Sequence, residues 1–199
     1  MTQTIDFYEQ NADSFFESTV GVEAQDLHQA FLAYLPQNAT ILDAGCGSGR
    51  DTLAFLRQGY RVFAFDGSEC MAKRAADLTG LPVQTSLFLD YTAGQLFDGI
   101  WACASLLHVP VEQLAVTFSH LSKFLKNEGV FYCSFKLGSG EVVRKGRHFT
   151  NLDEPGLEAI LTTTDLEMAK SWITTDLRPG RENEHWLNAI LKKASLKKA

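Results

Sequence analysis

The most informative segment of the chain runs from residue 41 to residue 51 and reads Ile41-Leu42-Asp43-Ala44-Gly45-Cys46-Gly47-Ser48-Gly49-Arg50-Asp51. A short apolar run, typical of a buried strand, leads directly into a Gly-x-Gly-x-Gly loop and then into a helix. Glycine lets the backbone turn tightly and approach a ligand where a Cβ atom would collide. The helix N-terminus that follows offers free N–H groups to polar or anionic ligand atoms. The segment therefore predicts a ligand-binding turn at the carboxyl end of a strand.

The next apolar run ends in an acid that suits the same site. Asp66 follows Asp43 by about 20 residues, the separation typical of a carboxylate that accepts hydrogen bonds from ribose hydroxyls. A nicotinamide-binding loop would place its third glycine at position 50, which is Arg50, and a P-loop would need Gly-Lys-Ser or Gly-Lys-Thr. Asp43 at the strand end suits a cofactor with an ammonium group and no pyrophosphate. We therefore predict S-adenosylmethionine as the cofactor, with S-adenosylhomocysteine as its product.

The charge balance argues against partners that carry many phosphates. The 199 residues include 18 Lys and Arg and 24 Asp and Glu, giving a formal net charge of -6. Four lysines lie among the last eight residues, so the rest of the chain is more acidic still. Nucleic acids and anionic membranes bind through Lys and Arg, and we expect neither as a partner. The length suits a single domain with its own core.

Cysteine usage is typical of a reducing compartment. The four cysteines form no C-x-x-C pair and have no histidine at metal-ligand spacing, so we expect neither a metal site nor a disulfide framework. The N-terminus has neither the basic nor the apolar segment of a signal peptide, and no uncharged run is long enough to span a bilayer. We expect a cytoplasmic protein that is a monomer or a homodimer.

Helix-like and strand-like stretches alternate along the chain, which is typical of a parallel α/β sheet. A polar, glycine-rich stretch at 136–150 interrupts the alternation and is interpreted as a flexible lid. Two helices are expected within 6–35 and further helices at 52–58, 69–78, 111–125 and 155–161. Strands are expected at 39–44, 61–66, 82–89, 97–104, 129–135, 166–174 and 185–192.

Four stretches resemble the motifs of class I S-adenosylmethionine-dependent methyltransferases: residues 42–49, 62–68, 97–109 and 125–131. In the last of these, Asn127 and Glu128 replace the usual Pro and Gly. The Gly-Arg-Asp that ends the glycine loop is most similar to small tellurite-resistance-like bacterial enzymes. The resemblance implies a Rossmann-like fold with a seven-stranded, mostly parallel sheet and an antiparallel last strand. It also implies one domain over 1–199, with a helical cap at 1–38 and the core at 39–199.

The resemblance implies which positions contact the cofactor. Arg50 would pair with the cofactor carboxylate, Asp90 would accept a hydrogen bond from the adenine amino group, and Tyr8 would close over the cofactor. Some of the implied positions have an alternative interpretation. Met71 and Cys103 would simply pack in the core, Asp90 would form a turn, and Arg50 would be a solvated residue at the start of a helix. The implied cofactor contacts are Tyr8, Asp43, Gly45, Cys46, Gly47, Gly49, Arg50, Asp66, Gly67, Ser68, Met71, Leu89, Asp90, Cys103 and Ala104.

His108 is the candidate catalytic residue, because an imidazole titrates near neutral pH and follows the fourth strand. Its alternative is a hydrogen-bonded residue at the entry of the next helix. The candidate substrate-binding residues are cations near glycine turns, because guanidinium groups suit carboxylates and phosphates. They are Lys136, Arg147, Arg178 and Arg181.

The residues and the resemblance together predict methyl transfer from S-adenosylmethionine to an O, N or S nucleophile of a small, anionic molecule, with no metal. A methyltransferase that acts on RNA or protein is the alternative enzyme. A non-catalytic S-adenosylmethionine-binding module is the alternative from another class, and a nicotinamide oxidoreductase is disfavoured by Arg50.

Overall fold

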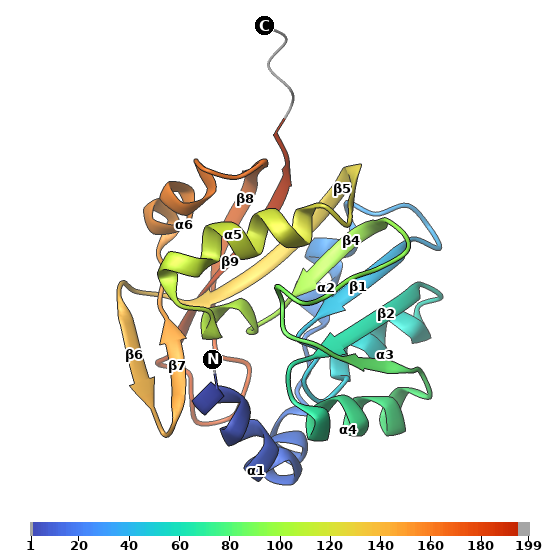
Figure 1. Cartoon of the computed structure of the whole chain (residues 1–199), viewed down its shortest axis with the longest axis vertical. Coiled ribbons are helices and arrows are strands. Elements are labelled where there is room, and N and C mark those ends of the chain that lie inside the picture. The colour runs from blue at the N-terminus through green and yellow to red at the C-terminus, as the bar shows by residue number, and fades with distance from the viewer. Residues whose placement is uncertain (1, 195–199) are drawn as a thin grey trace, which may run out of the picture.

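The computed structural model describes residues 2–194, so Lys197 and Lys198 lie outside the described residues. Seven strands form one sheet in the order β3-β2-β1-β4-β5-β9-β8 (Figure 1). All neighbours from β3 to β5 are parallel, and β9 is antiparallel to both β5 and β8. The predicted sheet with its antiparallel last strand is confirmed. The strands are β1 (Thr40–Ala44), β2 (Arg61–Asp66), β3 (Val83–Thr85), β4 (Phe97–Ala102), β5 (Leu125–Lys136), β8 (Leu166–Thr175) and β9 (His185–Lys193).

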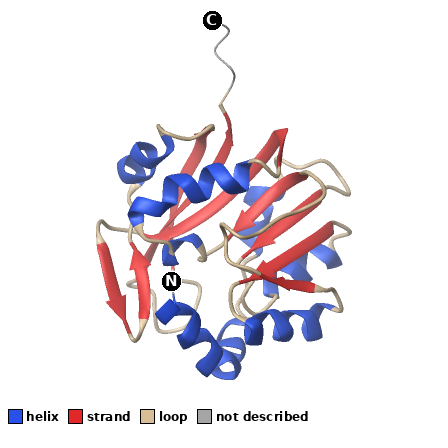
Figure 2. Cartoon of the chain, viewed as in Figure 1, coloured by secondary structure: helices blue, strands red, loops and turns tan. Residues whose placement is uncertain are grey.

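Helices cover both faces of the sheet (Figure 2). Because side chains alternate along a strand, Ile41 and Leu42 enter different hydrophobic clusters. The Leu42 cluster contains residues of α5 (Val111–Ser122) and α6 (Glu154–Leu161), and the Ile41 cluster contains Phe31 of α2 (Gln25–Leu32) and Phe55 of α3 (Arg50–Arg57). The helix α4 (Glu69–Thr79) packs beside β2 and β3. Among the described residues, no helix combines the length and the apolarity that crossing a membrane requires.

The first helix, α1 (Thr2–Thr19), lies across the carboxyl ends of the strands, between α4 and β7 (Figure 1). It bends at Asn11, whose φ of -122° is not helical and whose side-chain amide donates to the carbonyl of Phe7 at 2.8 Å. In the half before the bend, Thr4 Oγ1 accepts a hydrogen bond from the N–H of His148 at 3.0 Å. The other half carries Asp13, which forms an ion pair with Arg74 of α4. These contacts fix α1 over the ends of the strands.

The stretch 136–150 was expected to be a flexible lid, and most of it is instead a regular hairpin. It is made of β6 (Glu141–Arg144) and β7 (Arg147–Thr150). The two residues between the strands, Lys145 and Gly146, have φ values of 50° and 76°, the pair of positive angles that a tight two-residue hairpin requires. The structure also shortens the third strand, expected over 82–89, to three residues.

Candidate functional site

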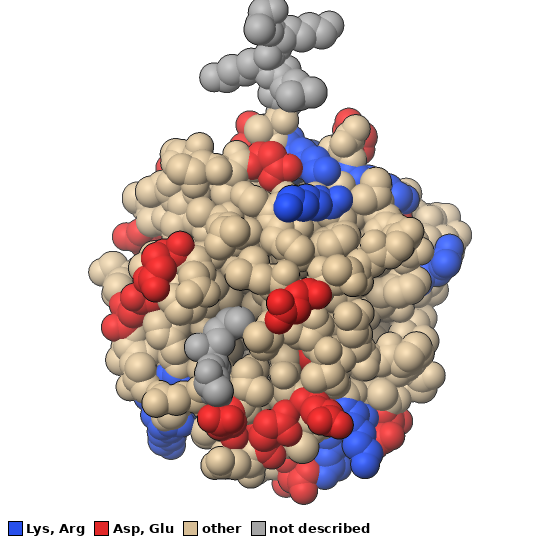
Figure 3. Space-filling model, viewed as in Figure 1, with Lys and Arg blue, Asp and Glu red and all other residues tan. Residues whose placement is uncertain are grey.

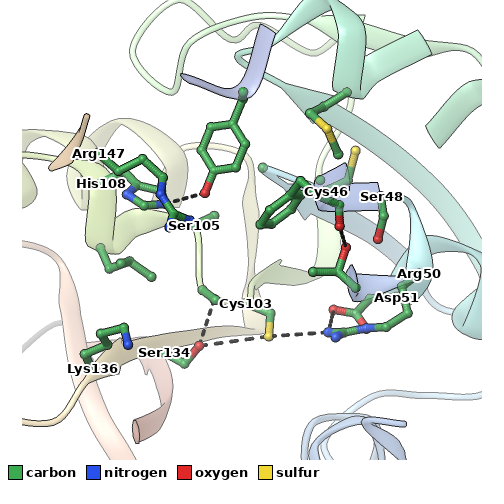
Figure 4. Close-up of a pocket in the computed structure, with 18 of the residues that line it drawn as sticks. Cys46, Ser48, Arg50, Asp51, Cys103, Ser105, His108, Ser134, Lys136 and Arg147 are labelled. Carbon is green, nitrogen blue, oxygen red and sulfur yellow. Dashed lines mark hydrogen bonds and ion pairs between the residues drawn. The ribbon is translucent and has the colours of Figure 1, made fainter. Parts of the chain in front are cut away.

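A cavity of about 590 Å³ opens at the carboxyl ends of the central strands, a size typical of small-molecule sites. Its walls come from the loops after β1 to β4, from α1 and β7, and from the segment that joins β8 to β9 (Figure 4). Most of the predicted site residues line it. They are Tyr8, Asp43, Gly45, Cys46, Gly47, Arg50, Asp66, Gly67, Met71, Cys103, Ala104, His108, Lys136, Arg147, Arg178 and Arg181.

Two predicted cofactor contacts serve helix starts and do not line the cavity. Gly49 is the N-cap of α3 with a φ of 77°, and a Cβ atom there would lie 3.0 Å from the Cα of Ala75. The absence of a side chain at Gly49 therefore lets the loop pack closely against α4. Ser68 is the buried N-cap of α4, where its hydroxyl accepts a hydrogen bond from the N–H of Met71 at 3.1 Å.

Asp90, predicted to accept a hydrogen bond from the adenine amino group, and its neighbour Leu89 also lie outside the cavity lining. The chain leaves the sheet at Thr85, and the N–H of Asp90 donates to the carbonyl of Leu87 at 3.2 Å, which closes a turn. Leu89 is 38% exposed on that turn. The third strand therefore ends earlier than predicted, and the cofactor contacts of Leu89 and Asp90 stay predictions. The wall at this point is formed by Ser86, Leu87 and Phe88.

The glycine loop is fixed to the ends of its neighbouring strands. The N–H groups of Gly45 and Cys46 both donate to the carbonyl of Phe65, at 2.9 and 3.0 Å. Gly45 has a φ of 78°, and a Cβ atom there would lie 2.6 Å from the Cβ of Ser105. Only glycine fits that position without displacing the loop after β4.

Asp66 lies at the end of β2 with both carboxylate oxygens engaged by backbone. Its Oδ2 accepts from the N–H of Gly47 at 2.8 Å, and its Oδ1 accepts from the N–H of Ser68 at 2.9 Å. Burial raises the pKa of Asp66, and these hydrogen bonds act in the opposite direction. A carboxylate oxygen accepts more than one hydrogen bond, so both oxygens keep capacity for ligand hydroxyls.

Asp43 presents a second carboxyl group at the same end of the cavity. Its Oδ2 accepts from the hydroxyl of Thr52 at 2.6 Å. Burial and the nearby charge of Asp51 raise the pKa of Asp43 to about 8. The group is therefore mostly neutral at pH 7 until a cation approaches it. Such a carboxyl group is suited to pairing with a ligand ammonium.

Arg50 was predicted to pair with a cofactor carboxylate, and the structure pairs it with its neighbour Asp51. The Nε and Nη2 atoms of Arg50 donate to the two oxygens of Asp51 at 2.7 and 2.8 Å (Figure 4). His28 of α2 and Trp101 of β4 also donate to this carboxylate, at 2.8 and 2.9 Å. The sequence analysis assigned no function to Asp51, although an acid in the first turn of a helix is a recognisable signal of a helix N-terminus.

The loop after β4 supplies the middle of the cavity. Ala104 has a φ of 52°, and its N–H donates to the hydroxyl of Ser134 at 2.8 Å. The next residue, Ser105, donates its hydroxyl to the carbonyl of Ala44 at 2.7 Å. A non-glycine residue in the left-handed region is uncommon and concentrates at functional sites. Ser105 lies in a loop, where serines are frequent, and Ser134 is a single serine within the fifth predicted strand, so neither carried a signal in the sequence.

Tyr8 and His108 meet across the mouth of the cavity. The Tyr8 hydroxyl donates to His108 Nε2 at 2.8 Å, and His108 Nδ1 donates to the carbonyl of His148 at 2.6 Å (Figure 4). A carbonyl only accepts, so the neutral ring carries its proton on Nδ1. Burial lowers the pKa of His108 to about 4, and the charge of Arg147 contributes. His108 was expected to titrate near neutral pH, and that expectation is corrected.

The predicted substrate-binding cations gather at the end of the cavity opposite to the glycine loop. Most of them are paired with a carboxylate. Lys136 forms an ion pair with Glu184, and Arg181 lies 3.4 Å from the same carboxylate. Arg178 donates from Nε to Asp176 at 2.8 Å. Arg147 is the exception, because it forms no ion pair with any described residue. Across residues 2–194, no three His, Cys, Asp or Glu side chains are grouped as metal ligands.

Known proteins resemble the chain in sequence and in fold. A curated relative, an uncharacterized methyltransferase of Staphylococcus carnosus (strain TM300), is 26% identical over 122 residues. The matching part is 57% of this chain and 59% of that relative, so the chain spans less than two thirds of the relative's length.

Among solved structures, the 1,6-didemethyltoxoflavin-N1-methyltransferase of Burkholderia thailandensis, crystallised with 1,6-didemethyltoxoflavin and S-adenosylhomocysteine, superposes with a TM-score of 0.78. It is 23% identical, over 98% of this chain and 87% of that one. The CcbJ methyltransferase of Streptomyces caelestis has a TM-score of 0.74 and 15% identity, over 97% of this chain and 99% of its own. Magnesium protoporphyrin IX methyltransferase of Synechocystis PCC 6803, with bound S-adenosylmethionine, has a TM-score of 0.69 and 19% identity, over 95% of each chain.

These structures share the fold of the chain. Its residues 16–170 match the sequence family described as "Methyltransferase domain". That match spans well over half of the chain and includes the glycine loop, Asp66 and the loop after β4. The chain therefore belongs to this methyltransferase family.

Proposed function

We propose that the chain transfers the methyl group of S-adenosylmethionine to an O, N or S nucleophile of a small, anionic molecule. The observation that carries the proposal is one cavity that is lined by the carboxyl groups of Asp43 and Asp66 and also by Arg147, a cation that forms no ion pair with any described residue. Membership of the methyltransferase family supports the reaction type. Membership of the tellurite-resistance-like subgroup stays a prediction from the Gly-Arg-Asp sequence.

The acidic end fits the groups that S-adenosylmethionine presents. Its ribose offers two hydroxyls, which suit the remaining lone pairs of Asp66. Its ammonium group suits the carboxyl of Asp43, which has a raised pKa and needs a cationic partner to ionise. Gly45 and Gly47 leave this wall without side chains, so a ligand can approach the backbone closely.

The cofactor supplies an electrophilic methyl group on a positively charged sulfur when it is bound. The chain's contribution is orientation, since aligning a nucleophile with a methyl group supplies up to about 7–11 kcal/mol of the barrier. The loop after β4, with Cys103 and Ala104, separates the two ends of the cavity and is the proposed meeting point. His108 is the proposed final acceptor of a proton when the nucleophile carries one: the proton passes to the Tyr8 hydroxyl oxygen as Tyr8 gives its own proton to the Nε2 lone pair to which it donates.

The charge distribution supports a small acceptor in place of RNA. The surface in Figure 3 carries both signs of charge, with acidic side chains gathered toward α1 and α4 and no continuous basic stripe on this face. A groove that tracks a phosphate backbone would need such a stripe.

The test is acceptor-dependent release of S-adenosylhomocysteine. The chain is incubated with S-adenosylmethionine and a metabolite extract that has been separated into anionic and non-anionic fractions. We expect product from an anionic fraction and none from the Asp66→Ala variant in the same fraction. Product from RNA or protein alone would overturn the small-molecule proposal. Binding of S-adenosylmethionine without product in any fraction would favour the non-catalytic module.

A further inference from the structure

Arg147 lies in an aromatic environment at the cation-rich end of the cavity. Its guanidinium carbon is 4.3 Å from the ring centroid of Phe7, 5.2 Å from that of Phe149 and 6.0 Å from that of Tyr8. These rings come from α1 and β7, so the two halves of the environment are far apart in sequence. The rings contribute cation–π attraction and remove water from the guanidinium.

The same guanidinium lacks the partner that its neighbours have. Its Nε atom is buried and has no hydrogen-bond partner. Lys136 is paired with Glu184 and Arg178 with Asp176, while Arg144 and Lys145 of the neighbouring hairpin are exposed to solvent. A desolvated polar group without a partner is costly, and buried charges in proteins are paired or bind an anion. Arg147 is therefore the cation at this end that is prepared to receive an anion from outside the described chain.

The shape and chemistry of this end restrict the anion. A guanidinium binds a planar carboxylate through two parallel N–H donors. Phe149 lies beside Arg147, and the cavity that Arg147 lines also has apolar walls, to which Leu107 and Leu177 contribute. Such a wall suits an apolar body attached to the carboxylate and disfavours a small, fully hydrated anion.

We propose that Arg147 anchors the acceptor of the methyl group, and that this acceptor is a carboxylate carried on an apolar, ring-shaped body. The inference rests on the proposed function and narrows its substrate class. His108 and Tyr8 lie beside the anchor, since Tyr8 contacts both His108 and the face of Arg147. A bound carboxylate cancels the charge of Arg147 next to His108, which makes the imidazole a better proton acceptor as the acceptor binds.

The experiment compares matched carboxylates and amides on the complex with S-adenosylhomocysteine. Benzoate and 2-naphthoate are titrated by ligand-observed NMR against benzamide and 2-naphthamide, which have the same rings without the charge. We expect both carboxylates to bind the wild type more tightly than their amides. In Arg147→Met, which keeps an apolar stem against the rings, we expect the carboxylate affinity to fall about 10- to 100-fold, the effect of losing a charge-assisted pair. The amide affinity stays unchanged.

Two further variants make the result specific. Arg147→Lys keeps the positive charge but not the two parallel N–H donors. We therefore expect its affinity for the carboxylates to lie between those of the wild type and Arg147→Met. Arg61→Gln removes an exposed cation of β2 outside the cavity and is expected to bind the carboxylates like the wild type. Circular dichroism confirms that each variant is folded, and the Lys variant decides the outcome if Arg147→Met does not fold.

The outcomes separate this inference from the proposed function. Calorimetry with S-adenosylhomocysteine alone tests the cofactor end, and Arg147→Met is expected to bind it like the wild type. If the wild type fails to bind S-adenosylhomocysteine, the proposed function is overturned. If it binds S-adenosylhomocysteine but neither carboxylate, or binds carboxylates and amides equally, the anchor is overturned. Equal carboxylate affinity in wild type and Arg147→Met overturns it as well.

Discussion

Replacing Asp51 by alanine removes the carboxylate on which three elements converge. Arg50 of α3 donates to it twice, His28 of α2 donates once, and the indole of Trp101 in β4 donates once. The side chain of Asp51 is 9% exposed and that of Arg50 is 21% exposed. The substitution leaves a largely buried guanidinium without its counter-ion and a fully buried indole N–H without an acceptor.

The expected loss follows from those two groups. Removing one partner of a buried ion pair costs about 3–5 kcal/mol, and the partial exposure of Arg50 places this pair at about 3 kcal/mol. The unsatisfied indole N–H of Trp101 adds about 1 kcal/mol. We therefore expect Asp51→Ala to lower the free energy of unfolding by about 4 kcal/mol, which many domains of this size survive.

Urea unfolding followed by circular dichroism measures the loss, and the chain offers a matched control. Asp13 also pairs with an arginine, Arg74, but its side chain is 75% exposed. Exposed pairs contribute about 0–1 kcal/mol, so Asp13→Ala is expected to change the free energy of unfolding by no more than that. Equal effects of Asp51→Ala and Asp13→Ala would refute the reasoning.

The pH dependence of the Asp51 effect has a defined sign. Burial alone would raise the pKa of Asp51, but the Arg50 charge and the hydrogen bonds from His28 and Arg50 outweigh it and keep the pKa below its ordinary value. A lowered carboxyl pKa stabilises the fold above the unfolded pKa and loses that contribution as the pH falls through the folded one. Because the charge of Asp51 also raises the pKa of Asp43, the comparison is made in an Asp43→Asn background, where the effect of Asp51→Ala is expected to stay constant near neutral pH and to shrink only in acid.

Three further predictions concern the cavity. Because the pKa of Asp43 is raised from 3.8 to about 8, the free energy of unfolding of the wild type falls as the pH rises through that interval. Urea titrations between about pH 5 and about pH 9 are therefore expected to show Asp43→Asn becoming more stable relative to the wild type. A difference that does not depend on pH would contradict this. The ring of His108, with a pKa of about 4, is expected to stay neutral with its proton on Nδ1 above about pH 5, and a ¹⁵N NMR titration that protonates it near pH 6.5 would be evidence against the burial argument. Gly45→Ala, whose Cβ would meet Ser105 at 2.6 Å, is expected to abolish binding of S-adenosylhomocysteine, whereas Gly59→Ala, with φ of 88° and open space around it, is expected to cost stability but not binding.

The cofactor end was predictable because its signals are local in sequence. The glycine spacing and Asp43 lie within one short segment, and Asp66 ends the next strand, so one βαβ pattern places all of them. The seven-stranded sheet with its antiparallel last strand came from the family resemblance and not from spacing. The third strand was predicted too long, because the period of the apolar residues does not reveal where a short edge strand ends.

The acceptor end depends on contacts between distant residues, which one sequence does not reveal. Arg147 acquires its environment from Phe7, which is contributed by the first helix. The pairing of Lys136 with Glu184 is visible only when β5 and β9 are side by side, whereas Arg178 pairs with Asp176 only two residues away. The low pKa of His108 was not predictable, because it results from burial of the ring, which is a property of the assembled fold. The hairpin was missed because its residues are polar.

Calorimetric titration of the wild-type chain with S-adenosylhomocysteine, and in parallel with NAD, tests the central claim most directly. We expect the wild type to bind one S-adenosylhomocysteine per chain in a saturable manner, Asp66→Ala to bind it much more weakly, and NAD to give no heat of binding. Saturable binding of NAD together with no binding of S-adenosylhomocysteine would contradict it.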